Sequence, residues 1–303
     1  MIQELAQSAP MAPTEIAPGT HLIREVQHAL GQQPLSVYIN SMVILGSEPI
    51  IVDTGSPRYR DAWLDHVFGL VEPADVKWVF LSHEDPDHAG NLAQVMAACP
   101  NATLVCSFAS VERYSNAYDF PLERCRWLNH GDRLQAGDRE IVAWRPPMYD
   151  SPTTRGLLDT TSRVYWAVDC FATSVPGGAG AAPLEDLRDL DRTEWWDGMV
   201  TFGLLGVSPW LSLVEPTRYT ASVNQLRQLD ISTIASAHSP AITGAQVDDA
   251  FDMIEQMAKA DAPPAPDQSV LEHVLATMTE GAAPTDLTKR GIKSTDGADG
   301  TPT

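Results

Sequence analysis

The sequence has few cysteines, few basic residues and no long apolar run. Its four cysteines show no CxxC spacing, and they are too few to form a disulfide scaffold in a chain of 303 residues. No stretch approaches the roughly 18 consecutive apolar residues of a membrane span. The first residues lack a basic region followed by an apolar run, so we expect no signal peptide and a cytoplasmic protein.

Positive charge is scarce, because 20 Lys and Arg residues stand against 40 Asp and Glu residues, giving a net charge of −20. Nucleic acids and anionic membranes need Lys and Arg to neutralise phosphate, so we expect neither as a partner. The acidity favours solubility in the first place, and an acidic surface for a basic redox partner protein remains an alternative. Hydrophobic residues make up 44% of the chain, which is enough for a sizeable core.

Apolar runs bounded by turn residues predict a mixture of strands and helices. We expect strands at 33–45, 49–54, 76–81, 103–106, 139–144, 164–169 and 231–236, helices at 61–70, 89–98, 192–203 and 219–229, and a loop at 175–183. Polar residues at the strand ends favour a layered α/β domain with a site at those ends.

Composition divides the chain into three parts. We expect an N-terminal extension at 1–20, one domain at 21–260 and a Pro/Gly-rich tail at 261–303. Within the tail, 269–278 has the pattern of one helix. The segment 280–303 is rich in Gly, Thr, Asp and Ala, which predicts disorder.

Four potential metal ligands, His83, Asp85, Asp87 and His88, fall within six residues. They follow an apolar strand and precede a helix, so a loop there can direct alternate side chains to one side. All four would crowd a single ion, and their spacing better suits two ions roughly 3.5–4 Å apart. The alternative, a polar turn that caps a helix, would account for one Asp or one His but poorly for all four.

The pattern from His83 to His88, with Asp53-Thr54-Gly55 about thirty residues upstream, resembles the metallo-β-lactamase superfamily. Hydrolytic members of that superfamily carry a third His where this chain has Asp85. Flavodiiron proteins, and oxygen-binding di-iron proteins similar to them, carry a carboxylate at this place. The chain therefore resembles the flavodiiron branch most closely, from about residue 20 to 250. This resemblance implies a four-layer αββα metallo-β-lactamase-type sandwich.

The resemblance also implies ligands beyond the loop. In the stretch 147–152, Asp150 stands where the flavodiiron proteins have His, a departure that still offers a metal ligand. Asp169 matches the bridging carboxylate, and His238 matches the last His ligand. The implied first site consists of His83, Asp85 and Asp150, and the implied second site consists of Asp87, His88 and His238, with Asp169 shared. Asp87 and Asp169 are the candidate catalytic residues, and Asp53 is expected to orient the loop by hydrogen bonds.

Charge and ligand type point to the metal. Four carboxylates carry −4 and balance two divalent cations. Oxygen-rich ligand sets favour iron and manganese over zinc, which prefers nitrogen and sulfur. Carboxylates also stabilise the ferric state. We therefore expect two iron ions, with zinc or manganese as alternatives.

Two functions remain open from the sequence. The first is a non-haem di-iron protein that binds, senses or reduces O₂ or NO. The second is a metal-dependent hydrolase of an ester, lactone, thioester or phosphodiester, with Asp87 orienting the nucleophile. Flavodiiron proteins carry a C-terminal flavodoxin domain, but only some forty low-complexity residues follow residue 260 here. We therefore expect no flavin on this chain, a separate electron donor, and a homo-oligomer.

Overall fold

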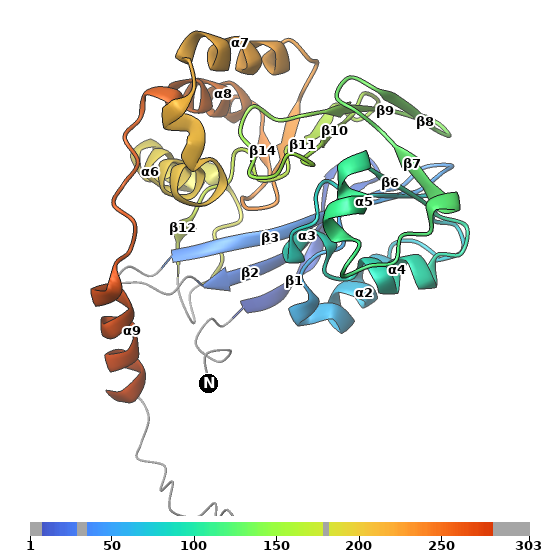
Figure 1. The fold of residues 1–303 in the computed structure, drawn as a ribbon, viewed down its shortest axis with the longest axis horizontal. Coiled ribbons are helices and arrows are strands. Elements are labelled where there is room, and N and C mark those ends of the chain that lie inside the picture. Colours follow the sequence, from blue (N-terminus) through green and yellow to red (C-terminus); the bar gives the residue numbers. More distant parts are fainter. Residues whose placement is uncertain (1–7, 29–34, 178–181, 281–303) are drawn as a thin grey trace, which may run out of the picture. The chain divides into compact units, whose positions relative to one another are not determined.

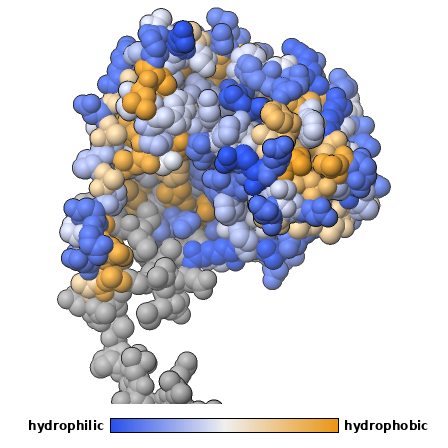
Figure 2. Space-filling model, in the orientation of Figure 1, coloured by the Kyte–Doolittle hydropathy of each residue, from blue (hydrophilic) through white to orange (hydrophobic). Residues whose placement is uncertain are grey.

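The computed structural model describes residues 8–28, 35–177 and 182–280. One compact unit ends at Ala265 and a second begins at Pro266. The described part of the second unit is helix α9 (Gln268–Glu280), where Leu271 and Leu275 are exposed. Figure 2 shows α9 with apolar side chains on one side and hydrophilic ones on the other. The predicted disorder falls, apart from Glu280, outside the described residues.

Two sheets form the framework of the first unit (Figure 1). The first sheet runs, in spatial order, through β1 (Ser8–Ala17), β2 (Thr20–His28), β3 (Leu35–Ile44), β4 (Ile50–Val52), β5 (Trp78–Phe80), β6 (Thr103–Cys106) and β7 (Cys125–Trp127). The second runs through β14 (Ile242–Thr243), β13 (Thr233–Ala235), β11 (Val164–Trp166), β10 (Gly156–Asp159), β9 (Arg139–Trp144) and β8 (Arg133–Ala136). Strands β4 to β7 are parallel, and so are β11 and β13.

Two strands differ from the sequence expectations. The sequence pattern did not indicate β1, which pairs antiparallel with β2. The loop predicted at 175–183 begins with a short strand, β12 (Val175–Pro176), which pairs with β3. Two residues are too few for a pattern to reveal, and this strand depends on its partner.

Helices cover the outer faces of both sheets. The helices on the first sheet are α2 (Arg60–Phe68), α3 (Pro86–Ala89), α4 (Leu92–Ala98) and α5 (Phe108–Tyr114). The helices on the second sheet are α6 (Arg192–Phe202), α7 (Pro216–Arg227) and α8 (Gln246–Gln256). Short 3₁₀ turns lie at η1 (Pro57–Tyr59), η2 (Leu122–Arg124), η3 (Leu187–Asp189), η5 (Pro209–Leu213) and η6 (Met257–Lys259), and a π-helix, η4, at Gly203–Val207. Among the described residues, no helix has the length and apolar character that a membrane crossing requires.

Alternation along the strands produces the layers. In β5, Trp78 and Phe80 join the apolar cluster between the two sheets, while Val79 joins the cluster under α2 and α4. In β11, Trp166 faces the other sheet and Tyr165 faces α6, α7 and α8. Since successive side chains of a strand point to opposite faces, each sheet buries both faces. The predicted αββα sandwich is confirmed.

Loops that follow the strands carry the polar residues. The end of one strand differs from the expectation. The strand expected at 164–169 ends at Trp166, so Asp169 lies in the turn that follows. Val168 has a φ of 57°, as does Asp53 after β4. A β-branched residue in this left-handed region is strained and persists only where its surroundings fix it. The strain therefore lies directly beside Asp169.

Candidate metal centre

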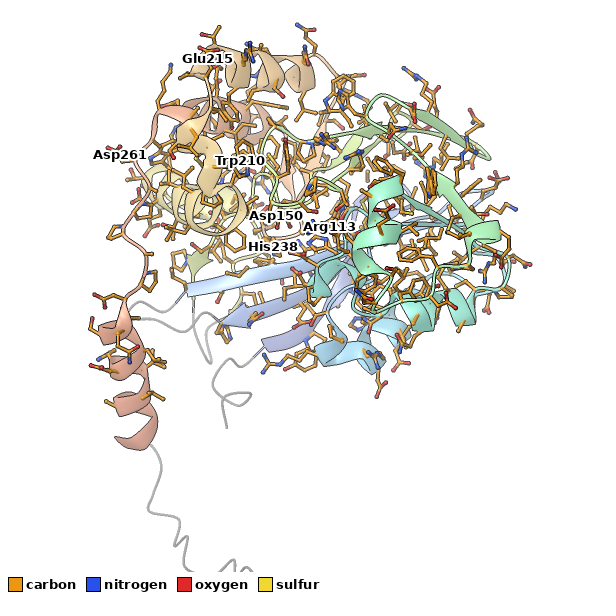
Figure 3. All side chains as sticks on the ribbon, in the orientation of Figure 1. Arg113, Asp150, Trp210, Glu215, His238 and Asp261 are labelled. Atoms are coloured by element: carbon orange, nitrogen blue, oxygen red, sulfur yellow. The ribbon has the colours of Figure 1, made fainter. Side chains whose placement is uncertain are left out.

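The structure brings the seven predicted site residues together from four segments of the chain. They form three overlapping groups, His83–Asp85–Asp150, Asp87–His88–His238 and His83–His88–Asp169, in each of which the potential ligand atoms lie within 4.8 Å of one another. Figure 3 shows Asp150 and His238, from different elements, approaching the same region. The first two groups are the two sites that the resemblance implies.

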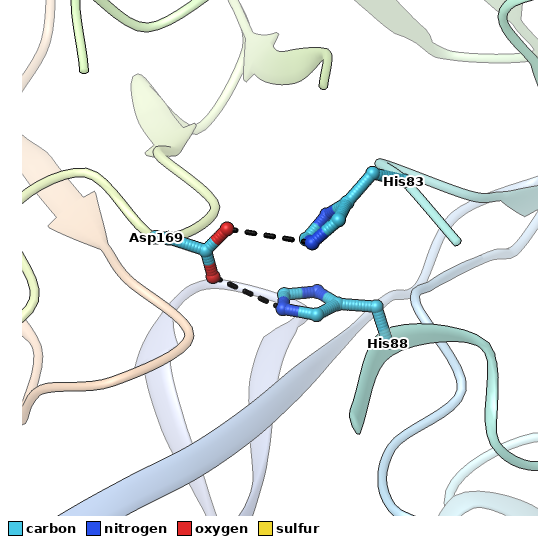
Figure 4. Close-up of side chains that lie close together, drawn as sticks. All are labelled: His83, His88 and Asp169. Atoms are coloured by element: carbon cyan, nitrogen blue, oxygen red, sulfur yellow. Dashed lines mark hydrogen bonds and ion pairs between the residues drawn. The ribbon is translucent and has the colours of Figure 1, made fainter. Parts of the chain in front are cut away.

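Asp169 lies at the centre of the cluster. Its Oδ1 is 3.0 Å from the Nε2 atoms of both His88 and His238. Its Oδ2 is 3.5 Å from Nε2 of His83. Figure 4 shows this carboxylate between the His83 and His88 rings, with one oxygen toward each. A single buried carboxylate thus serves both groups, as a bridging ligand must.

Two buried atoms in the cluster lack hydrogen-bond partners among the described residues: His83 Nε2 and Asp169 Oδ2. A buried polar atom without a partner costs about 1–3 kcal/mol. Around His83 Nε2, the nearest oxygens of Asp85 and Asp150 lie 3.7 and 3.8 Å away, too far for hydrogen bonds. These distances leave room for a cation between the imidazole nitrogen and the carboxylate oxygens. Imidazole nitrogen and carboxylate oxygen are also donors that suit a metal ion.

Hydrogen bonds behind the cluster orient two of the imidazoles. His88 Nδ1 lies 2.9 Å from Asp53 Oδ2, and His238 Nδ1 lies 2.8 Å from the carbonyl oxygen of Tyr38. Both partners accept hydrogen bonds, so each Nδ1 carries a proton, and Nε2 is the atom that each ring presents to Asp169.

Asp53 is itself held in place. Its carboxylate accepts hydrogen bonds from the backbone N–H and the hydroxyl of Ser82 and from Nε1 of Trp166. The predicted orienting role of Asp53 is confirmed, since it binds both the start and the end of the loop that carries His83 and His88.

Electrostatics keep the central carboxylate charged. Burial would raise the pKa of Asp169, but the neighbouring His88 and His83 hold it well below its usual value. The pKa of Asp150 is raised, first by burial and then by the charge of Asp169. The pKa of Asp85 is lowered by its interaction with His83. Asp169 therefore remains a carboxylate although it is buried.

The cluster forms one end of a cavity of about 370 Å³. Its other walls are Gln27, Val37, Ile39, Phe202, Gly206 and Val207. The last two belong to the π-helix η4, a type of segment often found at functional sites, and the ring of Phe202 lies 5.0 Å from that of His238. No motif in the sequence marks these wall residues, because the fold alone brings them to the loop at His83–His88.

Known proteins share this domain. Residues 37–239 match a family model described as ODP family beta lactamase. Diflavin flavoprotein A 1 of Synechocystis sp. is 28% identical over 135 residues, which cover 44% of this chain and 23% of that protein. The anaerobic nitric oxide reductase flavorubredoxin of Salmonella typhi is 23% identical over 133 residues, covering 44% and 28%. The structure of rubredoxin oxygen:oxidoreductase from Desulfovibrio gigas aligns with a TM-score of 0.67 at 17% identity, covering 82% of this chain and 61% of that one.

These matches differ in what they establish. The aligned segments span less than a third of the two curated relatives, while the structural alignment covers most of this chain and shows the fold. The family match covers more than half of the chain and includes all seven site residues. The predicted resemblance to flavodiiron proteins is confirmed. The chain belongs to the ODP beta-lactamase family.

Proposed function

We propose that this protein binds two iron ions and uses them to bind or reduce O₂ or NO. The first ion would be held by His83, Asp85 and Asp150, the second by Asp87, His88 and His238, and both by Asp169. One observation carries the proposal: both groups meet at Asp169, whose two oxygens face His83 on one side and His88 and His238 on the other.

The donor set supports iron. Four carboxylates and three imidazoles supply a charge of −4 for two divalent cations, and such oxygen-rich sites favour iron or manganese over zinc. When bound, ferrous ions supply the electrons and the open coordination positions that O₂ or NO requires. The apolar side chains of Val37, Ile39 and Val207 line the approach and suit small uncharged molecules.

Asp87 is the group we assign to proton handling. Its Oδ2 lies 3.4 Å from Nε2 of His238 and 3.7 Å from Nε2 of His88. Its side chain is also partly exposed and lines the cavity. A carboxylate in this position can accept or return a proton at the substrate while it binds the second ion.

The relatives favour this function over the hydrolase. By their names, the matched Salmonella typhi protein acts on nitric oxide and the Desulfovibrio gigas protein on oxygen. The carboxylate of Asp85, at the place of a third His, also argues against a zinc hydrolase. The same proposal includes a separate redox protein as electron donor, no flavin on this chain, a homo-oligomer and a cytoplasmic location.

Anaerobic purification tests the proposal. We expect two iron ions per chain and a near-ultraviolet absorption change when air or NO is added. The Asp169→Ala variant should lose both the iron and the absorption change, whereas Glu140→Ala, on the surface at Arg133, should keep both. Two zinc ions with no response to O₂ or NO would instead support the hydrolase.

A further inference from the structure

Glu84 lies between two proposed ligands but faces a different way. His83 and Asp85 line the cavity, and Glu84 does not. Its side chain is only 8% exposed. Successive residues of an extended loop point to opposite sides, so the turn that directs His83 and Asp85 into the cavity directs Glu84 behind it. A buried carboxylate in such a place must find partners.

Those partners lie in the loop that carries Asp150. The hydroxyl of Thr153 donates to Oε2 of Glu84, and the hydroxyl of Ser151 donates to Oε1 at 3.3 Å. Both hydroxyl residues are buried. A backbone hydrogen bond from Arg155 N–H to Ser82 O, 3.0 Å long, closes the same junction. The His83 loop and the Asp150 loop are thus joined by hydrogen bonds at Ser82 and at Glu84.

Tyr149, which precedes Asp150, is also held by hydrogen bonds. The N–H of Tyr149 donates to the Ser208 hydroxyl at 3.0 Å, and its carbonyl accepts from Nε1 of Trp210 at 3.0 Å. Asp150 therefore lies between two fixed neighbours, Tyr149 and Ser151. The Ser151 side depends on Glu84.

Charge completes the arrangement. The guanidinium of Arg113, on α5, donates from Nε to Oε1 of Glu84. Arg113 is half-exposed, so its free face is hydrated while its other face neutralises the buried carboxylate. The charge of Asp150 also acts on Arg113, and Figure 3 shows both residues in the same part of the view. The pKa of Arg113 is raised, chiefly by this hydrogen bond.

We propose that Glu84 is a positioning residue that fixes Asp150 against His83 through Ser151 and Thr153, and thereby determines whether the first site retains its metal ion. This inference rests on the proposed function. An Asp side chain is shorter than the His that the resemblance predicts at position 150, so its backbone must lie closer to the cation. A small displacement of this backbone then removes the ligand, because the side chain has no length to compensate.

Anaerobic titration with ferrous iron against a competing chelator tests the proposal. Wild type should bind two ions. Glu84→Ala should keep the second ion and weaken the first by about 10–100-fold, the usual effect of removing a hydrogen-bonding partner behind a metal ligand. Thr153→Val, which retains the side-chain shape, should weaken the first ion in the same direction. Glu84→Gln keeps an acceptor for Thr153 and should restore most of the affinity.

Two further variants separate positioning from general loss of stability. Asp159 is a buried carboxylate bonded to Arg139, at the far end of β10 from the Asp150 loop. Asp159→Asn should lower thermal stability but leave both ions bound. The double variant Glu84→Ala/Asp150→Ala should bind the first ion no more weakly than Asp150→Ala alone, since residues acting through one another are not additive.

The outcomes are distinguishable. If Glu84→Ala binds both ions with wild-type affinity, or if its effect adds in full to that of Asp150→Ala, the positioning role is wrong while the proposed function stands. If wild type itself fails to bind two ions, the proposed function is wrong and the positioning role with it.

Discussion

The two halves of the candidate centre are built differently. In the second half, the His88 and His238 rings are buried, and each is held at Nδ1 by a partner from the core, Asp53 or Tyr38. In the first half, the carboxylates of Asp85 and Asp150 are 50% and 27% exposed. His83 Nδ1 has a longer contact, 3.2 Å, to the Ser82 hydroxyl.

This difference indicates which of the two sites should bind its metal ion more tightly. Ligands fixed before binding lose less conformational freedom when the ion arrives. The second site is therefore expected to hold its ion more tightly, and the first site to depend on the loop network around Glu84. Asp85 is the most exposed of these carboxylates, and like Asp87 and Asp150 it lines the cavity through which a substrate would approach.

The largest effect should come from removing the group that the two halves share. Asp169→Ala deletes one ligand from each site and the negative charge between three imidazoles. We expect the affinity for both ions to fall by more than about 100-fold, beyond the 10–100-fold of indirect partners. Elemental analysis after reconstitution measures it. Retention of one tightly bound ion would show that Asp169 does not bridge.

A second variant removes the partner that holds His88 directly, in the anchored half. Asp53→Asn can place its amide N–H₂ at the Oδ2 position, where the Ser82 hydroxyl, His88 Nδ1 and Trp166 Nε1 all donate. We expect the second ion to bind about 10–100-fold more weakly, and the free energy of unfolding to fall by about 1.5–3 kcal/mol. Chelator competition and chemical denaturation give the two values. An equal loss at both sites would remove the distinction between the halves.

A third variant alters only the exposed half. Asp150→His replaces the departure from the flavodiiron pattern with the residue that the resemblance predicts. Adding an imidazole should raise the preference for zinc over iron at the first site several-fold, since zinc favours nitrogen ligands. Competitive loading with equal ferrous iron and zinc measures the ratio. An unchanged ratio would mean that residue 150 does not contact the ion.

We expect the smallest effect from a change at Arg113, the half-exposed partner of Glu84. Arg113→Ala removes the half-exposed partner of Glu84, and water can take its place. We expect the free energy of unfolding to fall by about 1 kcal/mol, because Ser151 and Thr153 still donate to the buried carboxylate of Glu84, with both ions retained. Thermal denaturation and metal content check this. Loss of the first ion would show that charge, rather than the Ser151 and Thr153 contacts, holds the Asp150 loop.

The sequence predicts the parts of the centre that are local. His83, Asp85, Asp87 and His88 lie within one loop, so their spacing alone indicates a metal cluster. Asp150, Asp169 and His238 required the family resemblance, because no short-range pattern relates them to the loop. Apolar runs and polar strand ends predicted a layered α/β domain, whereas the four-layer αββα arrangement required the resemblance as well.

The remainder depends on tertiary contacts. Glu84 accepts a hydrogen bond from Thr153, 69 residues away, and no sequence pattern in either segment predicts this pair. The turn that places Asp169 beyond β11 uses a positive φ at Val168, a residue type that normally avoids it. The cavity wall at Gly206 and Val207 lies on a π-helix, which no hydrophobic period predicts.

The central claim is that seven side chains hold two ions that share Asp169. Anomalous diffraction at the iron absorption edge, on crystals of the protein loaded with ferrous iron, tests it most directly. We predict two peaks roughly 3.5–4 Å apart, one beside His83 and Asp150 and the other beside His88 and His238, with Asp169 between them. A single peak, or an Asp150 side chain turned away from the metal, would contradict the account.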